Sequence, residues 1–145
     1  MTDSIEQEIV AVHNKYRAQV GVPPIQWSND LASQAQEWAN YLTSNRLFQH
    51  SRVKGEGENL WIGTSHAYSF TQMIDSFGDE KQDFIDGVFP NVSNRVNWVN
   101  VGHYTQVVWK NTTHVGCAGL DGPDGMYRLV CRYSPPGNVF GQRVF

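Results

Sequence analysis

The sequence has few cysteines, no cluster of basic residues and no long apolar run, and these absences exclude several classes of protein. Eleven lysines and arginines stand against fourteen aspartates and glutamates, which gives a formal net charge of −3. Because nucleic-acid-binding modules normally show a basic patch, we expect no nucleic-acid partner. No apolar run approaches the roughly 20 residues that a membrane-spanning helix needs, so we expect no transmembrane segment.

The beginning of the sequence also lacks the marks of a targeting signal. Met1–Glu8 is polar and acidic, whereas a signal peptide begins with basic residues and continues with an apolar stretch. Thr2 stands where N-myristoylation requires a glycine. Two interpretations stay open: an intracellular or membrane-peripheral protein, or the mature part of an extracellular, secreted one.

What the chain does have is enough sequence for one folded domain. Its 145 residues are 40% hydrophobic, an ordinary fraction for a globular protein, and can bury a core without a metal or many disulfides. We therefore predict a single domain over residues 1–145.

The first half of the sequence predicts two amphipathic helices. Capping-box spacing at Ser4 and Gln7 begins the first, and a glycine followed by two prolines ends it. Ser28 precedes the second, which has the clearest amphipathic pattern of the chain. We place His13 and Arg17 on the polar face of the first helix, and expect the His13 side chain to be solvated or locally bonded.

A third helix is predicted from a capping box at Ser69 through about Phe84. Glu80 lies on the same stripe as the phenylalanines of this helix. A carboxylate on an inward face needs a partner, because burying it unpaired is costly. Gly78 costs about 1 kcal/mol relative to alanine in mid-helix, and indicates that another group approaches the backbone there.

Two loop regions differ from ordinary solvated loops. In the glycine-rich segment 55–61 we expect the Glu56 carboxylate to be solvated. Glu58 directly precedes residues that are expected to pack, so its carboxylate has less freedom. The segment 85–99 is unusually apolar. It either covers the core, which the sequence alone favours, or lines an apolar ligand groove.

The stretch 101–113 is rich in β-branched and aromatic residues. We interpret it as a central strand that is covered on both faces, with His103 just before it. At that place a histidine either caps a loop or is held as a reactive side chain at the rim of a cleft. The stretch alone favours the structural role.

The last third of the chain predicts a β-hairpin of residues 115–120 and 126–134 around a turn-rich connection. Its two cysteines, Cys117 and Cys131, lie at equal distances from Asp124. Opposite positions on adjacent strands can be close enough for a disulfide, if the register permits it. Such a pair fits an oxidising compartment better than a metal site.

Together, these motifs resemble the CAP superfamily of cysteine-rich secretory proteins, antigen 5 and pathogenesis-related 1 proteins. Residues 102–112 look like the first signature of the family, and residues 131–139 are similar to the second. The glycine-rich box around Glu58 and the helix of Glu80 fall in family order. Arg128 departs from the second signature, which prefers an apolar residue there.

The resemblance implies an α+β fold, a three-layer α-β-α sandwich with a small, mainly antiparallel sheet between helices. It also implies that His50, Glu58, Glu80 and His103 converge in one cleft. By the same resemblance, His50 and His103 are assigned as ligands of a divalent metal such as Zn²⁺. The two glutamates would orient the imidazoles or act as general base on a bound water.

Three functions are compatible with this resemblance, since a fold does not settle a function. We prefer a secreted, non-enzymatic protein that binds an apolar lipid, a sterol or a fatty acid. The second is a metal-dependent hydrolase or protease centred on the four cleft residues. The third is a defence or signalling module that recognises a protein or receptor partner through its loops. The residues expected to bind the lipid are Phe84, Val88, Phe89, Val92 and Trp98.

Overall fold

The computed structural model describes residues 4–145, and the following elements belong to that range. The helices are α1 (Ser4–Gln19), α2 (Asn29–Asn45), α3 (Phe70–Gly78) and α4 (Gly102–Val108), with two short 3₁₀-helices, η1 (Asp79–Asp83) and η2 (Trp98–Asn100). The strands are β1 (Gln26–Trp27), β2 (Gly57–Thr64), β3 (His114–Asp121) and β4 (Met126–Ser134).

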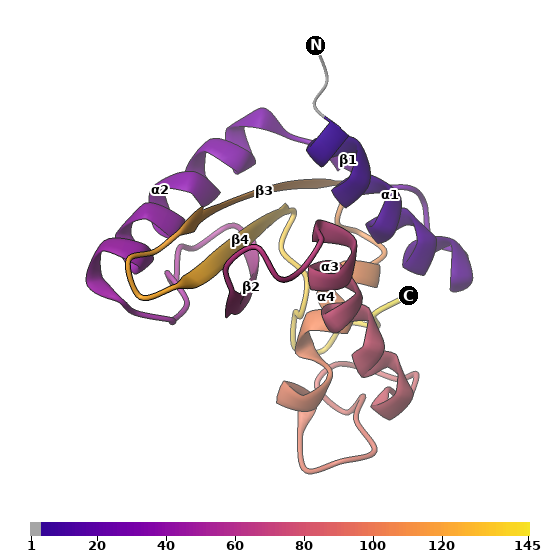
Figure 1. Cartoon of the computed structure of the whole chain (residues 1–145). Helices are drawn as coiled ribbons and strands as arrows, with labels where there is room; N and C mark the ends of the chain where they lie inside the picture. Colours follow the sequence, from indigo (N-terminus) through magenta and orange to yellow (C-terminus); the bar gives the residue numbers. More distant parts are fainter. Residues whose placement is uncertain (1–3) are drawn as a thin grey trace.

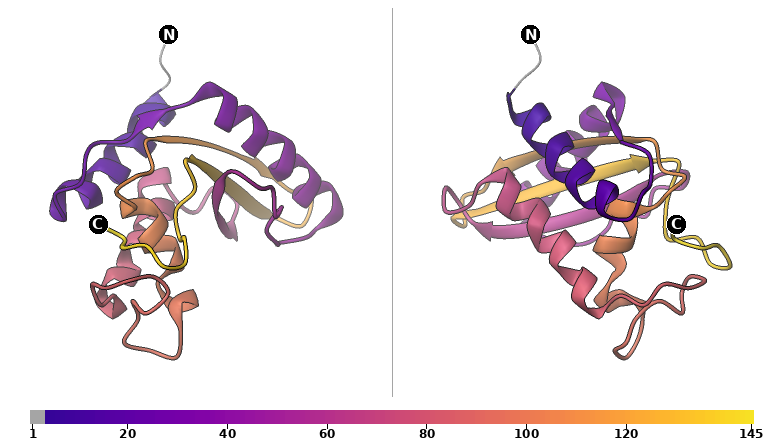
Figure 2. Two further views of the ribbon diagram at one scale, coloured as in Figure 1. Left: turned by 180° about the vertical axis from the view of Figure 1, so that it is seen from behind. Right: turned by 90° about the vertical axis from the view of Figure 1, so that its right-hand side faces the viewer.

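The strands form one sheet in the order β1-β3-β4-β2. β4 pairs antiparallel with both β2 and β3, and the short β1 pairs parallel with β3. Helix α2 lies along one face of this sheet, whereas α1, α3 and α4 gather on the other side (Figures 1 and 2). The predicted α+β sandwich with a mainly antiparallel sheet is therefore confirmed.

Two hydrophobic cores follow from this layering, because neighbouring residues of a strand face opposite sides of the sheet. On β4, Val130 packs with Ala35, Ala39 and Leu42 of α2 in the smaller core. The other face of the sheet contributes to the larger core, which α1, α3 and α4 share. At Gly116 a Cβ atom would meet the backbone of α2, so glycine permits the close approach of helix and sheet there.

The predicted helix starts are correct where the structure describes them. Ser28 accepts a hydrogen bond from the Leu31 amide, and Ser69 forms the predicted capping box with Gln72. The third helix ends earlier than expected, at Gly78, and continues as η1. A Cβ at Gly78 would meet the ring of Tyr16, which confirms that another group approaches the backbone at this glycine. Ser4 is itself the first described residue of α1, and the residue before it lies outside the described range.

The prediction of a central strand at 101–113 is wrong, because this stretch contains helix α4. Six of the seven residues of α4 are buried. A short helix that is enclosed on nearly all sides needs apolar residues around its whole circumference, and that pattern cannot be told from a doubly covered strand by periodicity. Tertiary packing overrides the β-propensity of the valines here.

The polar face predicted for the first helix is also wrong, since His13 and Arg17 are 0% and 1% exposed. The Arg17 guanidinium donates to the carbonyls of Val107, Trp109 and Thr112, at and just beyond the end of α4. These carbonyls have no partner further along that helix, so a buried cation satisfies them. Burial lowers the pKa of Arg17 to about 10.

His13 is locally bonded, as one of the two predicted alternatives stated, but it is not solvated. Its Nδ1 lies 2.9 Å from the Ile9 carbonyl oxygen and its Nε2 lies 2.8 Å from the Tyr133 hydroxyl. A carbonyl only accepts hydrogen bonds, so Nδ1 carries the proton and Nε2 accepts from the tyrosine. Burial lowers the pKa of His13 to about 4.

Candidate functional site: a cleft with two histidine–glutamate pairs

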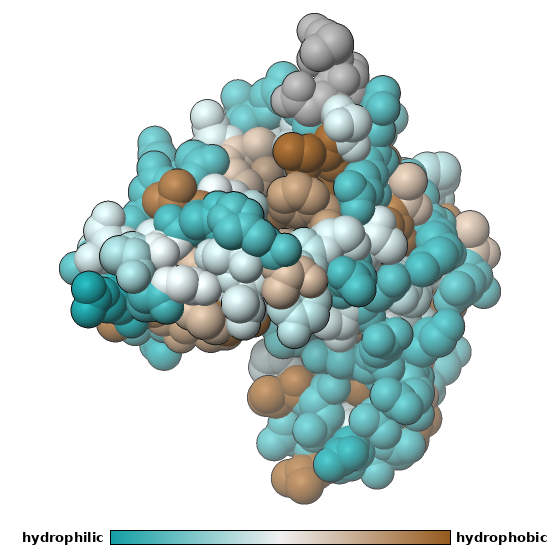
Figure 3. Space-filling model, viewed as in Figure 1, coloured by the Kyte–Doolittle hydropathy of each residue, from teal (hydrophilic) through white to brown (hydrophobic). Residues whose placement is uncertain are grey.

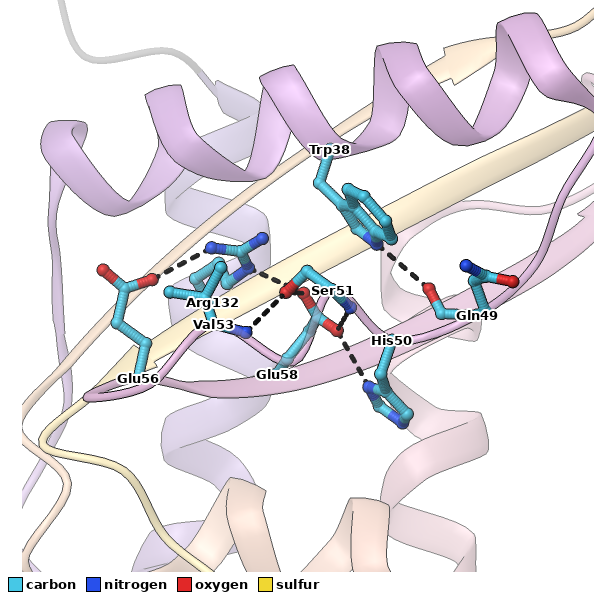
Figure 4. A network of polar contacts seen from close by, with 8 residues as sticks. All are labelled: Trp38, Gln49, His50, Ser51, Val53, Glu56, Glu58 and Arg132. Atoms are coloured by element: carbon cyan, nitrogen blue, oxygen red, sulfur yellow. Dashed lines mark hydrogen bonds and ion pairs between the residues drawn. The ribbon is translucent and has the colours of Figure 1, made fainter.

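The first pair joins a loop to the edge strand of the sheet. His50 lies in the loop before β2 and Glu58 lies on β2, with 2.8 Å between His50 Nδ1 and Glu58 Oε1. Glu58 also accepts from the Ser51 amide at 3.0 Å, the Ser51 hydroxyl at 2.8 Å and Arg132 Nε at 2.7 Å (Figure 4). A carboxylate has about four lone-pair sites, so these four donors fill the capacity of Glu58.

The second pair joins η1 to the first turn of α4. His103 Nδ1 lies 2.8 Å from Glu80 Oε2, and the Tyr104 amide donates to Glu80 Oε1 at 3.0 Å. The ring of Phe77 stacks on the His103 imidazole, with 5.0 Å between centroids and 5° between planes. Glu80 thus has the partner that the sequence pattern required, although it lies in η1 and not on the α-helix.

Both histidines line one cavity of about 300 Å³. Glu58 also lines the cavity. Glu80 does not, but it is hydrogen-bonded to His103, which does. Trp98, Val99 and Gly102 form its apolar wall, and Asn59 and Asn138 add amides.

The hydrogen bonds to the two carboxylates fix the tautomer of each imidazole. A carboxylate accepts hydrogen bonds when ionised, so each Nδ1 donates its proton and each Nε2 keeps a free lone pair. Burial by itself would raise the pKa of Glu58, but the hydrogen bonds from His50 and Ser51 and the charge of Arg132 hold it below its usual range. Glu58 is therefore ionised at neutral pH.

Arg132 is a site residue that the sequence reasoning did not single out, and it also corrects the prediction for Glu56. Its guanidinium lies on the α2 side of the sheet and donates to Glu58 and, at 3.1 Å, to Glu56 (Figure 4). The Glu56 side chain is only 16% exposed, so it is not solvated as expected. Arg132 is directly opposite Glu58 in the β2–β4 register, but that register is not visible in the sequence.

Asn59 connects the cleft to the core behind it, and was likewise not singled out. Its amide donates to the His103 carbonyl at 3.1 Å and to the Tyr133 hydroxyl at 3.2 Å. Tyr133 in turn donates to His13, so a buried chain of polar groups runs from α1 to the first turn of α4.

The chemistry of the donors fits a metal ion held by two imidazoles. A ligating histidine typically donates its other ring N–H to a carboxylate, and both histidines here have that arrangement. Within residues 4–145 no group of three or more histidine, cysteine or acidic side chains is placed to hold a metal. An ion in the cleft would therefore take its remaining ligands from water or a substrate.

The residues predicted to bind lipid occupy different environments. Phe89 and Val92 are fully buried in the larger core, so the segment 85–99 covers the core in part, as the sequence favoured. Phe84 and Trp98 are half-buried, and Val88 is 45% exposed. The lower part of the molecule also shows separate apolar patches between hydrophilic ones (Figure 3). The most exposed apolar side chains are Val96, Val99 and Phe140.

The two cysteines form a disulfide, as the hairpin spacing allowed. Cys117 and Cys131 are directly opposite each other in the β3–β4 register, and the bond joins the two strands.

Comparison with known proteins agrees with the fold. The molecule is a mixed-sheet α+β sandwich whose cleft is edged by histidine–carboxylate pairs. The model of the cysteine-rich secretory protein family matches residues 10–133, and the chain belongs to this family, the CAP family. Pathogenesis-related protein 1B of Nicotiana tabacum is 38% identical over 141 residues, which cover 97% of this chain and 80% of the tobacco protein. Cysteine-rich secretory protein 3 of Homo sapiens is 37% identical over 148 residues, which cover 92% of this chain but 57% of the human protein.

Solved structures show the same fold. BmVAL-1 has a TM-score of 0.80 and 25% identity, covering all of this chain and 83% of its own. NaASP2, solved with Zn²⁺, has a TM-score of 0.79 and 22% identity, covering all of this chain and 86% of its own. None of the helices that the structure describes is long and apolar enough to cross a membrane.

Proposed function

We propose that the protein is a secreted, non-enzymatic CAP protein that binds an apolar lipid, a sterol or a fatty acid, next to a histidine pair that can hold a divalent metal. One observation carries the lipid proposal: Trp98 and Val99 form an apolar wall of the cleft, and Val99 remains 64% exposed. Ligand pockets are concave and mostly apolar, so an apolar wall that remains partly exposed at a cleft supports a binding surface there. The disulfide supports secretion, since such bonds persist in oxidising compartments.

The hydrogen bonds of the two glutamates favour binding over hydrolysis. A general base needs a lone pair that faces the reacting water. Glu58 already accepts four hydrogen bonds, which fill its lone-pair sites, whereas Glu80 accepts one on each oxygen. Glu58 is therefore suited to orienting His50 rather than to acting as a base.

His50 and His103 would hold the metal through Nε2, in keeping with the Zn²⁺ in the NaASP2 structure. When bound, Zn²⁺ would supply Lewis acidity, and the residues of this chain would orient and screen it. Titration calorimetry with Zn²⁺ tests the assignment. Glu80→Gln should weaken binding by about 10- to 100-fold, because it removes the carboxylate that orients His103.

Native mass spectrometry tests lipid binding after incubation with a sterol and, separately, with a long-chain fatty acid. We expect an adduct with at least one lipid, and less of it in Val99→Asp. Leu120→Asp is the matched control, because Leu120 is also exposed (38%) but lies on the hairpin away from the cleft.

Two results would overturn the proposal. One is the lack of an adduct with either lipid where a known binder gives one. The other is hydrolysis of a peptide or an ester in a broad screen that is lost in both His50→Ala and Glu80→Gln, which would establish the hydrolase instead.

A further inference from the structure

Two short stretches of the chain have the pattern that N-glycosylation requires, an asparagine followed two residues later by serine or threonine, with no proline between them. They are residues 91–93, Asn-Val-Ser, and residues 111–113, Asn-Thr-Thr. Both stretches lie in loops, one between η1 and η2 and the other between α4 and β3. A pattern this short also arises by chance, so the surroundings of each asparagine have to support it.

The two stretches are held at the surface in the same way. Asn91 and Asn111 are exposed. The middle residues, Val92 and Thr112, are both 0% exposed. Val92 packs in the larger core, and the Thr112 hydroxyl donates to the Pro135 carbonyl at 2.8 Å. Each buried middle residue therefore anchors its loop, while the asparagine before it faces solvent.

The side-chain amides of these two asparagines are also free of hydrogen bonds. Neither Asn91 nor Asn111 has a side-chain partner within residues 4–145, and of the other asparagines only Asn94 has none. The remaining asparagines all form hydrogen bonds through their side chains: Asn14, Asn29, Asn40, Asn45, Asn59, Asn97, Asn100 and Asn138. A sugar attached to one of these would disturb a contact of the fold, whereas Asn91 and Asn111 have no such contact to lose.

There is room for a sugar beside the Asn111 amide. A cavity of about 430 Å³ lies there, lined by Lys110, Asn111, Gln142, Arg143 and Phe145. The charged and amide side chains of this cavity are able to form hydrogen bonds with sugar hydroxyls. Neither Asn91 nor Asn111 lines the histidine cleft, so a glycan at either position is attached outside the proposed binding site.

We propose that Asn91 and Asn111 carry N-linked glycans. This proposal rests on the proposed secretion of the protein, because N-glycans are attached on the secretory route. Each asparagine Nδ2 would form a bond to the anomeric carbon of an oligosaccharide that is delivered on a lipid pyrophosphate. The bond from that carbon to the pyrophosphate oxygen breaks, the lipid pyrophosphate leaves, and Nδ2 gives up one of its two protons.

Mass spectrometry of the protein from its natural source tests the proposal, before and after treatment with an amidase that releases N-glycans. Before treatment, we expect the mass of the chain plus two glycans. After treatment, peptide mapping should find an aspartate in place of Asn91 and of Asn111, because the amidase hydrolyses the glycosylated side-chain amide. In a secreting eukaryotic host, Asn91→Gln and Asn111→Gln should each remove one glycan and leave the other.

Asn94→Gln is the matched control, because Asn94 is also exposed and unbonded but is not followed by the required serine or threonine. It should leave both glycans in place, and Thr113→Ser should keep the glycan that Thr113→Ala removes. A secreted protein with the mass of the bare chain overturns this proposal but not the proposed secretion, whereas a protein found only inside the cell overturns both. A single glycan overturns the assignment at the other asparagine.

Discussion

The two halves of the cleft hold their histidines in opposite ways. In the His50–Glu58 half, the carboxylate is 8% exposed and held by four donors, whereas the imidazole is 57% exposed. In the His103–Glu80 half, the imidazole is less exposed, at 36%, and is stacked on Phe77. The first half therefore encloses the carboxylate and leaves the imidazole exposed to solvent, whereas the second half packs the imidazole against an aromatic ring.

From this difference we expect Arg132 to contribute more than His50 to the stability of the first half. Arg132→Ala should lower the free energy of unfolding by about 3–5 kcal/mol, because it leaves Glu56 and Glu58 without their cation. Urea unfolding at neutral pH measures the loss. The control is Arg143→Ala, which breaks an ion pair with Asp86 whose side chains are both half-exposed, and should change stability by less than about 1 kcal/mol.

A further variant in the same unfolding experiment tests whether the unpaired glutamates cause the loss of stability in Arg132→Ala. Arg132→Met combined with Glu56→Gln and Glu58→Gln should recover part of the loss, since no buried charge would then lack a partner. If this triple variant is as unstable as Arg132→Ala, packing rather than charge explains the effect.

The buried polar chain behind the cleft should respond to acid through His13. The pKa of His13 is about 4 in the folded chain, against 6.5 for an ordinary histidine, so the unfolded state binds more protons between these pH values. Stability should therefore fall as the pH drops from about 6.5 to 4, by on the order of 3 kcal/mol from this group.

Urea unfolding at a series of pH values measures this fall, and His13→Gln should reduce it. Glu58, whose pKa is lowered, adds its own loss as the pH falls through and below its usual titration range. Equal pH dependence in the original and the variant chain would show that His13 does not titrate on unfolding.

The smallest effect is expected at the exposed histidine. His50→Ala should change the free energy of unfolding by less than about 0.5 kcal/mol, because Ser51 and Arg132 still hold Glu58. His103→Ala should cost about 1–2 kcal/mol, since it removes the Phe77 stack and leaves Glu80 with one donor. Equal costs would mean that the two halves do not differ.

The sequence was a good guide where local rules decide the structure. The caps at Ser28 and Ser69 depend on neighbouring residues, and the hairpin disulfide depends on spacing around one turn. Helical periodicity predicted that Glu80 needs a partner, and the structure identifies it as His103, although Glu80 lies in η1, beyond the end of the α-helix.

The sequence was a poor guide where distant segments decide the environment of a residue. His13 and Arg17 have polar side chains, but several of their partners lie in residues 107–133, and only the fold brings these together. The stretch that forms helix α4 was predicted as a strand, because a helix that is enclosed on nearly all sides has apolar residues in the same pattern as a strand covered on both faces. Arg132 was missed because its role depends on the pairing of β4 with β2.

The position of the disulfide has a consequence for the register of β4. Cys131 precedes Arg132 and Tyr133, which face opposite sides of the sheet: the arginine is bonded to Glu56 and Glu58, and the tyrosine to His13 in the larger core. A slip of one residue would exchange the two faces, moving a guanidinium into the apolar core and a phenol among the glutamates. The disulfide between Cys117 and Cys131 is compatible with only one alignment of β3 and β4. It therefore keeps the Arg132 guanidinium on the α2 side of the sheet.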